Sequence, residues 1–564
     1  MVSLFNALNM SSNALTVNES AISVVSHNVA NMNTEGYSKQ KVHLATRNIA
    51  GAIGDSTEAQ IRANGGVMIA NVMRYNDAYL NNYYRDQLSI LKGYEAELGT
   101  LGDLADIFDD LEGEGISATL ASFYDAVNNL NEYPASATAR VNFIESAKTL
   151  TQALNSKSQQ LDELTSKALG NGEDEELLKN SKIYHEFGVF NSRLEELAEI
   201  NKALQVTQTG TLHANNLLDK RDMLLNEIAE FVDINIEEHP TNGSVTLYVG
   251  NQVMVKGAEV KAKLEIQTAA KYCEEYSKEN PTNPITYPQD WILKDNKGQP
   301  VLDEYNQPIA REAAVVSIVG INDDGTTTDI IKDANSIIKT GSIGGLLHSG
   351  DIQAENMTAG KAQHALNMVA QSVAKVFNDL NTRKNAYAIN PLDTGKLTPT
   401  TGDNYIFVGK DGTPDSISAG NITINSSLLT DDGCWKLACA YFDNPQNLDP
   451  PPTFDENAIG NSQNVVSMLG TRTSKLNELG NMSIEDYYTN LLGKIAAGGS
   501  SAEAMVETQG NVVEAIKDQI LSNNSVDLNE ELVDLVKYQT AYSAAAQVFN
   551  TCNSCLDVLM ALGG

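Results

Sequence analysis

Two residues begin a pattern that is typical of zinc peptidases. His185 and Glu186 match the first half of H-E-x-x-H, in which two histidines bind the metal and the glutamate acts as a general base. The position four residues after His185 holds Val189, which has no ligand atom. The seven His and five Cys residues show no other ligand spacing, so the sequence predicts no metal site and no cofactor.

Three further patterns resemble a redox motif, a phosphate loop and a functional charge pair, but each favours a structural role. Cys552 and Cys555 match C-x-x-C, but they fall late in a predicted helix, where two small packed residues are the simpler interpretation. The 341–345 segment is glycine-rich but lacks the Lys and Ser/Thr of a phosphate loop, and it suits a strand-to-helix turn. The adjacent charges Arg221 and Asp222 are expected to form a surface or partly buried pair that is worth little energetically. The sequence therefore predicts no enzyme.

The elements around these residues are dominated by apolar stripes at both ends of the chain. At the N-terminus, positions alternate by fours and threes, as in the seam of one long coiled-coil helix. The C-terminus carries a similar seam. The two seams pass through Leu4, Leu8, Ser11, Leu15, Asn18, Ile22, Val25 and Val29, and through Leu528, Leu532, Leu535, Gln539, Tyr542, Ala546, Phe549, Leu556 and Leu559.

Neither stripe is expected to hold a helix alone. Burying large aliphatic side chains gives about 1.5 to 3 kcal/mol each, whereas ordering the backbone costs about 1 to 2 kcal/mol per residue over a much longer segment. We therefore expect the terminal helices to pair, to be disordered in the monomer and to fold on assembly. An ordinary buried helix pair inside one globular domain would give the same pattern, but the position of the stripes at the chain ends favours a subunit that closes on itself and polymerises.

Bulk composition excludes several classes of protein. The chain has 564 residues, 42% of them hydrophobic, and a formal net charge of −34. Such a charge argues against nucleic acid as a partner, and the absence of an apolar run of eighteen residues argues against membrane insertion. The N-terminal residues lack a basic region followed by an apolar core, so no cleavable secretory signal is expected.

The order of patterns predicts a multidomain α+β chain with paired terminal coiled-coil helices, a helical-bundle middle domain and β-rich outer insertions. Helical periodicity predicts single helices from Leu177 to Phe231 and from Ile343 to about Lys384, and a helical C-terminal part broken at Gly498 and Gly499. We divide the chain into a terminal core domain (1–36 and 526–564), a helical domain (37–234, 341–385 and 458–525) and two β-rich insertions (235–340 and 386–457).

Three stretches carry a resemblance to a known family. The segment 26–38, S-H-N-V-A-N-M-N-T-E-G-Y-S, is similar to the signature of flagellar rod, hook and hook-associated proteins, with Glu35 in place of the usual Pro. The segment 74–80, R-Y-N-D-A-Y-L, opens the helical part as in hook-associated proteins. The segment 215–227 closely resembles the motif N-x-L-L-D-x-R-D-x-L-L. Together with the stretch from Phe123 through Pro134 to Arg140, and with matches at 346–347, 509–512 and 526–531, they resemble the hook-associated protein 1 family of bacterial flagella over about 1–240, 341–384 and from 460 onward.

The resemblance implies a structural subunit that joins hook to filament and is exported without a cleaved signal by the flagellar type III system to the extracellular flagellum. Its implied partners are further copies of itself, hook protein, hook-associated protein 3 and a cytoplasmic export chaperone at the C-terminal region. The predicted assembly residues are Leu4, Leu8, Leu15, Ile22, Val25, Val29, Leu532, Leu535, Tyr542, Phe549, Leu556 and Leu559. The family motif residues are Asn31, Gly36, Tyr37, Asn216, Leu218, Asp219, Arg221, Asp222 and Leu225.

Two alternatives share parts of this pattern. Hook-associated protein 3 or a flagellin has similar terminal helices, although not usually the 215–227 motif at this chain length. A secreted adhesin with its activity in the β-rich insertions would belong to a different class.

Overall fold

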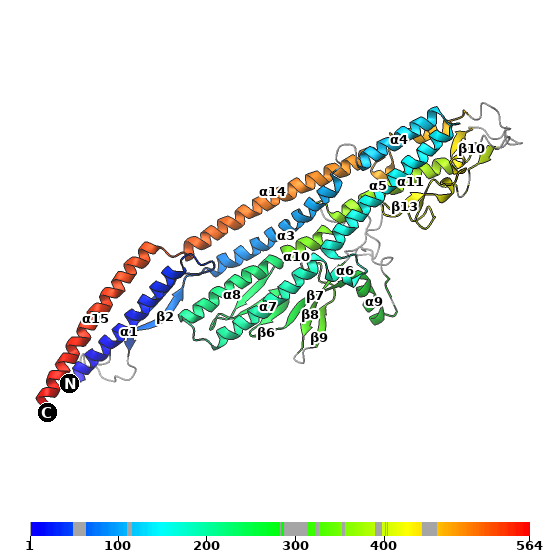
Figure 1. The fold of residues 1–564 in the computed structure, drawn as a ribbon. Helices are drawn as coiled ribbons and strands as arrows, with labels where there is room; N and C mark the ends of the chain where they lie inside the picture. The colour runs from blue at the N-terminus through cyan, green and yellow to red at the C-terminus, as the bar shows by residue number, and fades with distance from the viewer. Residues whose placement is uncertain are drawn as a thin grey trace.

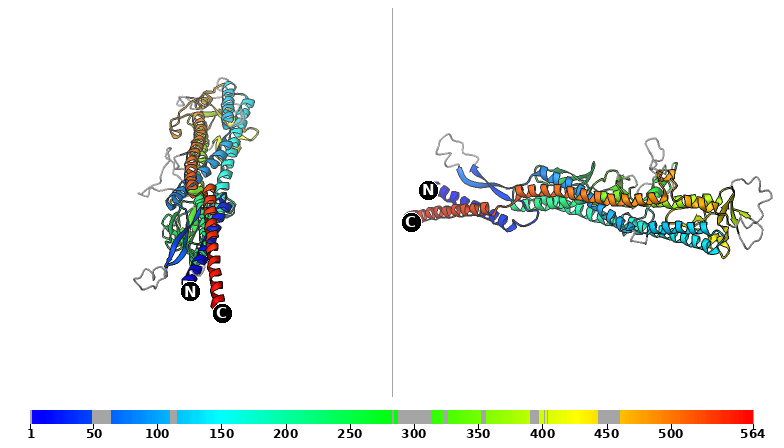
Figure 2. Two further views of the ribbon diagram at one scale, coloured as in Figure 1. Left: turned by 90° about the vertical axis from the view of Figure 1, so that its left-hand side faces the viewer. Right: turned by 90° about the horizontal axis from the view of Figure 1, so that it is seen from above.

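The protein forms a long rod in which both chain ends lie at the same tip (Figure 1). The structure is a computed structural model that describes residues 2–48, 64–109, 115–282, 284–286, 314–322, 326–351, 356–389, 397–400, 402, 404–442 and 460–563. Two further views confirm that the rod is narrow in both directions across its axis (Figure 2). The predicted fold class, a multidomain α+β chain with a terminal helix pair, is confirmed.

The tip of the rod consists of the two terminal helices and one hairpin. Helix α1 (Val2–Asn31) packs along α15 (Leu528–Gly563). Strands β1 (Gln40–Asn48) and β2 (Asn64–Arg74) form an antiparallel pair, and β2 packs on α1. The chain then leaves the tip through one long helix and returns through another, so everything between residues 75 and 527 forms the body of the rod.

Those two connecting helices lie side by side and antiparallel (Figure 1). Helix α3 (Ala78–Phe108) begins at Asp77, whose carboxylate accepts hydrogen bonds from two backbone N–H groups of the first turn. Helix α14 (Ile484–Asn524) has 41 residues. It continues without interruption through Gly498 and Gly499, so the predicted break there is wrong.

The half of the rod nearer the tip, here called the proximal lobe, combines short helices with two antiparallel sheets. One sheet has the order β3-β4-β5-β6 and the other β7-β8-β9. The elements are α6 (Glu175–Lys179), α7 (Lys182–Val206), α8 (Leu212–Phe231), α9 (Ala269–Glu279), α10 (Gly341–Ser349), β3 (Asn235–Glu238), β4 (Val245–Val249), β5 (Gln252–Lys256), β6 (Glu259–Val260), β7 (Ala262–Thr268), β8 (Ala314–Ile321) and β9 (Thr327–Ile331).

The far half, here called the distal lobe, is a helical bundle with small sheets at its end. Its core packs aromatic rings of Phe123, Phe143, Phe377 and Phe407 against one another. The elements are α4 (Ile116–Glu132), α5 (Ala137–Leu169), α11 (Ala359–Thr382), α13 (Gln463–Gly470), β10 (Ala386–Ile389), β11 (Leu397–Pro399), β12 (Phe407–Gly409), β13 (Ile422–Ile424) and β14 (Ala438–Tyr441), with 3-10 turns η1 (Ser426–Leu428), η2 (Gly433–Lys436) and η4 (Asn477–Leu479).

Two predicted helices are each divided in the structure. The predicted helix from Leu177 to Phe231 is split into α6, α7 and α8, because Ser181 and Thr211 cap new helices by accepting a backbone hydrogen bond. The predicted helix from Ile343 to Lys384 is split into α10 and α11, and Thr358 caps the second one. Helix α9 was not predicted in the β-rich range. The sheets of the two lobes fall within the 235–340 and 386–457 ranges, parts of which lie outside the described residues, whereas the β1–β2 hairpin lies outside both ranges. The domain boundaries themselves stay a prediction.

Glycines of α10 allow it to approach its neighbours closely. A Cβ on Gly345 would lie 2.2 Å from the carbonyl oxygen of Gly93 in α3, and one on Gly341 would lie 2.2 Å from the carbonyl oxygen of Phe231 in α8. Gly341 also has a φ of +79°, which favours glycine. The glycine-rich segment is therefore a packing element at a turn into a helix, as the sequence suggests.

The close contact predicts the effect of one substitution. Gly345→Ala should lower the free energy of unfolding by about 1 to 3 kcal/mol, because the added methyl group forces backbone atoms apart. Gly188→Ala in α7 is the matched control, because a Cβ there would meet no atom within 4 Å, and it should leave stability unchanged or raised by up to about 1 kcal/mol. Urea denaturation of both variants measures the difference, and equal stabilities would contradict the packing account.

Candidate assembly surface and its anchoring joint

The joint between the tip and the rod is built around a buried carboxylate. Asp222 of α8 accepts a hydrogen bond from Arg74 Nη2 at 2.6 Å, where β2 ends. Arg85 Nη2 of α3 lies 3.4 Å away from the same carboxylate and Arg221 Nη2 lies 2.8 Å away. Arg74 Nε also donates to Asp219 at 2.6 Å. Five charges from three elements therefore meet at one point.

Burial and charge compete at these carboxylates. Burial by itself would raise the pKa of Asp222, but the guanidinium groups of Arg221, Arg74 and Arg85 outweigh it and lower this pKa to about 2. Burial raises the pKa of Asp219, although Arg74 and the Ser38 hydrogen bond act in the opposite direction. Burial likewise lowers the pKa of Arg85. Asp222 is thus the carboxylate whose negative charge is held most firmly.

The position of this cluster corrects one expectation from the sequence. Arg221 and Asp222 were expected to form a weak surface or partly buried pair, but both are buried, with exposed fractions of 3% and 8%. The physical reason is that Asp222 faces Arg74 and Arg85, which lie far away in the sequence. Sequence reasoning missed Arg85 altogether, and the only available signal was the density of charge within the 215–227 motif.

A second polar contact ties the two terminal helices to the hairpin. The side-chain amide of Asn28 in α1 donates to the Gln40 carbonyl oxygen at 2.8 Å and to Glu531 Oε2 of α15 at 3.0 Å. The hydroxyl of Tyr37 donates to Asn28 Oδ1 at 2.7 Å. Lys39 Nζ lies 3.5 Å from Glu531 Oε1. Asn28 thereby fixes the lengthwise register between α1, α15 and β1.

The remaining motif residues lie around the same joint. Gly36 has a φ of +75°, and a Cβ there would collide with the Met223 side chain of α8. Asn31 donates to the His27 carbonyl oxygen at 2.9 Å and so ends α1. The other three lie on α8, where Asn216 accepts from Gln40 Nε2 at 3.3 Å, Leu218 is half-buried near Gly243, and Leu225 is buried in the core. Motif segments about 180 residues apart in sequence thus converge on one place.

Along the terminal pair itself, burial of the predicted apolar residues decreases away from the joint, although Ser11, Val17 and Cys552 remain buried there. The compact cluster of Ala21, Val24, Val25 and Tyr538, with Ile22 and Leu535 against it, lies at the joint end. Toward the tip the predicted residues Leu4, Leu8, Leu15, Phe549 and Leu556 are only half-buried, and so is Val29 near the end of α1. The pair is therefore anchored at one end and loosely packed at the other.

Helix α15 also carries an apolar face that no described part of the chain covers. Leu532 and Leu559, two predicted assembly residues, are each 46% exposed, and Tyr542 is 38% exposed. Leu528, Leu532 and Val536 follow one another at steps of four and so lie on one face of the helix, here called the outer stripe. The large apolar residues of these two helices that are between 40% and 69% exposed are Leu528, Leu532, Val533, Val536, Val548, Val558, Leu559 and Met560 on α15, and Phe5 and Met10 on α1. The predicted seam therefore mixes residues that face α1 with residues that face solvent.

The zinc-peptidase pattern at His185 and the C-x-x-C pattern at Cys552 are each placed on a long helix. His185 lies exposed on α7 with Val189 where a second ligand would be needed, and Cys552 is buried in α15 while Cys555 is exposed. In the parts of the chain that the structure describes, no group of three His, Cys, Asp or Glu side chains could hold a metal ion. None of the helices in those parts is both long enough and apolar enough to span a bilayer.

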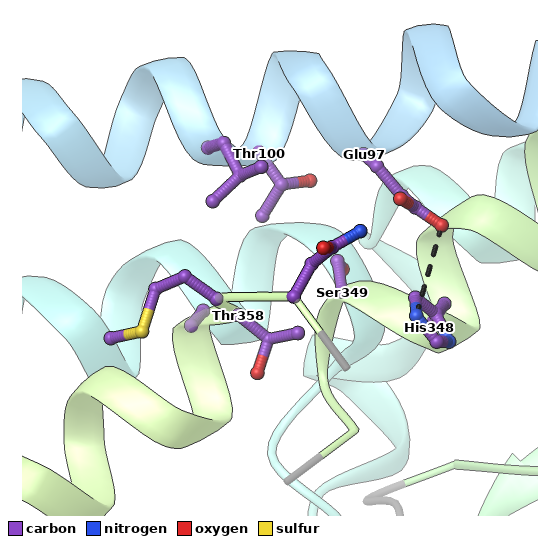
Figure 3. A pocket seen from close by; sticks show the side chains of 9 residues that line it. Glu97, Thr100, His348, Ser349 and Thr358 are labelled. Atoms are coloured by element: carbon purple, nitrogen blue, oxygen red, sulfur yellow. Dashed lines mark ion pairs between the residues drawn. The ribbon is translucent and has the colours of Figure 1, made fainter. Parts of the chain in front are cut away.

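One acid and histidine pair not singled out by the sequence lies between α3 and α10 (Figure 3). Glu97 Oε1 is 4.0 Å from His348 Nε2, and burial raises the pKa of Glu97 while the nearby His348 acts to lower it. The adjoining cavity has a volume of about 10 Å³, which is room for about one water molecule. It offers no space for a substrate.

Comparisons with known proteins agree with the position of these features. Three family descriptions match the sequence, namely the flagellar hook-associated protein FlgK helical domain over residues 101–279, the flagellar basal body rod FlgEFG protein C-terminal region over 517–562, and the flagella basal body rod protein over 8–37. The two shorter matches cover most of α15 and α1.

Whole-chain similarity is low in identity but complete in length. Flagellar hook-associated protein 1 of Bacillus subtilis is 24% identical over the full length of both chains. The protein of the same name from Salmonella typhimurium is 23% identical, over 98% of this chain and 99% of its own. The structure of the flagellar hook junction protein FlgK from Burkholderia pseudomallei shares the fold, with a TM-score of 0.50 and 13% identity over 79% of this chain and all of the other.

The buried cluster predicts a large effect for a small change. Asp222→Asn leaves three guanidinium groups without their shared carboxylate and should lower the free energy of unfolding by about 3 to 5 kcal/mol. Because the folded pKa of about 2 lies below the ordinary value of 3.8, the contribution of the Asp222 charge is complete above about pH 5 and is lost as the pH falls through about 2. Urea denaturation of parent and variant at several pH values measures it.

The matched control is Glu530→Gln, which removes one partner of Lys39 at a carboxylate that is 51% exposed. It should change stability by at most about 1 kcal/mol. If Asp222→Asn changes stability no more than this control does, the joint is not held by the buried charges.

Proposed function

The chain belongs to the flagellar hook-associated protein 1 family, and we propose that it joins the hook to the filament by polymerising through its terminal helices. Its relatives are structural proteins of the flagellum, and the chain is a structural component of the same organelle. The outer stripe on α15 is the single observation that supports this mode of assembly most strongly.

The argument from the outer stripe is energetic. Each of Leu528, Leu532 and Val536 would contribute about 1.5 to 3 kcal/mol if it were fully buried, and the chain itself leaves them exposed. A contiguous apolar face on a soluble protein marks a binding surface. Neighbouring copies stacked around an axis would cover this face, so the terminal helices would form the inner wall of a tube. The body of the rod would extend outward from it.

The same proposal names the neighbouring proteins. Hook protein would lie on one side of this chain along the axis and hook-associated protein 3 on the other, and each would contact copies of this chain through equivalent terminal helices. The chain would reach that position unfolded through the flagellar type III channel, without a cleaved signal. The β-rich ranges 235–340 and 386–457 would face solvent, and the protein would carry no enzymatic activity.

The test of the junction role is a deletion strain. Cells that lack the chain should retain hooks but release flagellin into the medium, and the parent gene should restore filaments. Complementation with Leu532→Gln/Val536→Gln should fail, because the outer stripe loses its apolar character. The purified variant should keep its stability within about 0.5 kcal/mol, because both positions are exposed.

Asn550→Gln on the same helix is the control, because Asn550 is exposed and polar; it should restore filaments. Normal filaments with the double variant would refute assembly through the outer stripe, and normal filaments in the deletion strain would refute the junction role itself.

A cytoplasmic chaperone would shield the same face before export. Removal of residues 526–564 should therefore abolish binding to the export chaperone, as measured by calorimetry with the purified partner. The double variant at the outer stripe should bind more weakly than the parent. Unchanged affinity of the truncated chain would place the chaperone site elsewhere.

A further inference from the structure

The hydrophobic interior of the rod is divided into two cores that share no residue. Along α3 the change falls between Ala96, which belongs to the proximal core, and Leu101, which belongs to the distal core. On α5 it falls between Leu164 and Ala168. Core packing is therefore interrupted at one level of the rod, here called the core boundary.

Three helices also end or begin at the core boundary. Helix α5 ends at Leu169, α10 ends at Ser349, and α11 begins at Ala359. Among the described helices, α3 and α14 alone continue for several turns on both sides of this level (Figure 1). The two lobes are thus connected chiefly through the antiparallel helices α3 and α14, here called the struts.

Both struts carry glycines at this level. Helix α3 has Gly99 and Gly102, and α14 has Gly498 and Gly499 followed by two serines. The two sets are neighbours in space, because a Cβ on Gly498 would lie 3.8 Å from Leu101 Cδ2.

Packing explains only one of these four glycines. A Cβ on Gly498 would lie 2.9 Å from the Met357 side chain, so glycine is required there. A Cβ on Gly99, Gly102 or Gly499 would meet no atom within 4 Å. These three positions have room for a side chain, yet they hold the residue that most weakens a helix interior apart from proline. An alanine would fit at each of these positions, so glycine differs from alanine there only in that it makes the helix less stable.

We propose that the core boundary is a hinge at which the distal lobe bends relative to the proximal lobe. Glycine and serine pairs are sites where helices bend, and here they occur in both struts at the proximal end of the distal core, between Leu98 and Leu104 on α3 and between Ile495 and Ala502 on α14. A small cavity lined by Glu97 and Thr100 lies at the same level (Figure 3). The hinge follows from the packing of a single chain and does not depend on the proposed function.

The experiment measures the distance between the lobes in the full-length chain. Spin labels are attached at Lys202→Cys in α7 and Asn142→Cys in α5, both exposed positions, after the exposed native thiol is removed by Cys555→Ser. The parent should give a broad distance distribution by pulsed electron spin resonance. Gly99→Ala/Gly102→Ala/Gly499→Ala should narrow it, because alanine stiffens both struts without a steric clash.

Amide hydrogen exchange on the same proteins provides a second measurement. Amides next to each substituted glycine should exchange about fivefold more slowly, since Gly to Ala stabilises a helix by roughly 1 kcal/mol. Gly510→Ala is the matched control, because it lies in α14 away from the core boundary and its Cβ would also meet no atom within 4 Å. It should slow exchange locally and leave the distance distribution broad.

Three outcomes would overturn the hinge. They are a parent distribution as narrow as that of the triple variant, a triple variant as broad as the parent, and a control that narrows the distribution as much as the triple variant does.

Discussion

The structure depends on the pairing of the two ends of the chain. Because α1 lies along α15, the chain must leave the tip and return to it, and this requirement makes α3 and α14 antiparallel neighbours (Figure 1). Asn28 and Glu531 fix the register of the pair across 503 positions of sequence. Everything else is an insertion between two struts, so its lobes can vary without changing the part of the molecule that assembles.

The rod is rigid at one level and compliant at another. At the joint, five buried charges bind β2, α3 and α8 together, and removal of Asp222 takes away the one carboxylate that all three guanidinium groups share. Such an arrangement sets the angle between tip and rod more than it adds stability. Farther along the rod, both struts carry glycines beside the boundary between two hydrophobic cores. The joint would be the fixed attachment of a subunit that joins hook to filament, and the proposed hinge would be the place where its body bends.

Sequence periodicity predicted the long elements well. The terminal helices follow from local patterns, and the structure has them where they were predicted. The C-terminal seam was correct in period but not in phase, because apolar residues on α15 serve two faces, one toward α1 and one exposed. A single stripe drawn through Leu532 and Leu535 cannot separate them.

Features that depend on distant partners could not be predicted. Nothing local shows that Asp222 meets Arg74 and Arg85, so the sequence predicted only a surface or partly buried pair with Arg221. Gly498 was predicted to break the helix, but the helix continues. The position holds glycine because the Met357 side chain packs where a Cβ would be. Helix capping by Ser181 and Thr211 was visible in principle but was masked by continuous apolar periodicity on both sides.

Hydrogen exchange of the terminal helices tests the central claim most directly. Because the pair is well packed only near the joint, residues 540–560 of the dilute single chain should exchange their amide hydrogens rapidly, while α5 exchanges slowly. The same residues should become protected when copies assemble. If residues 540–560 of the dilute chain were protected as strongly as α5, the terminal helices would be stably folded without neighbouring copies. That result would contradict this account.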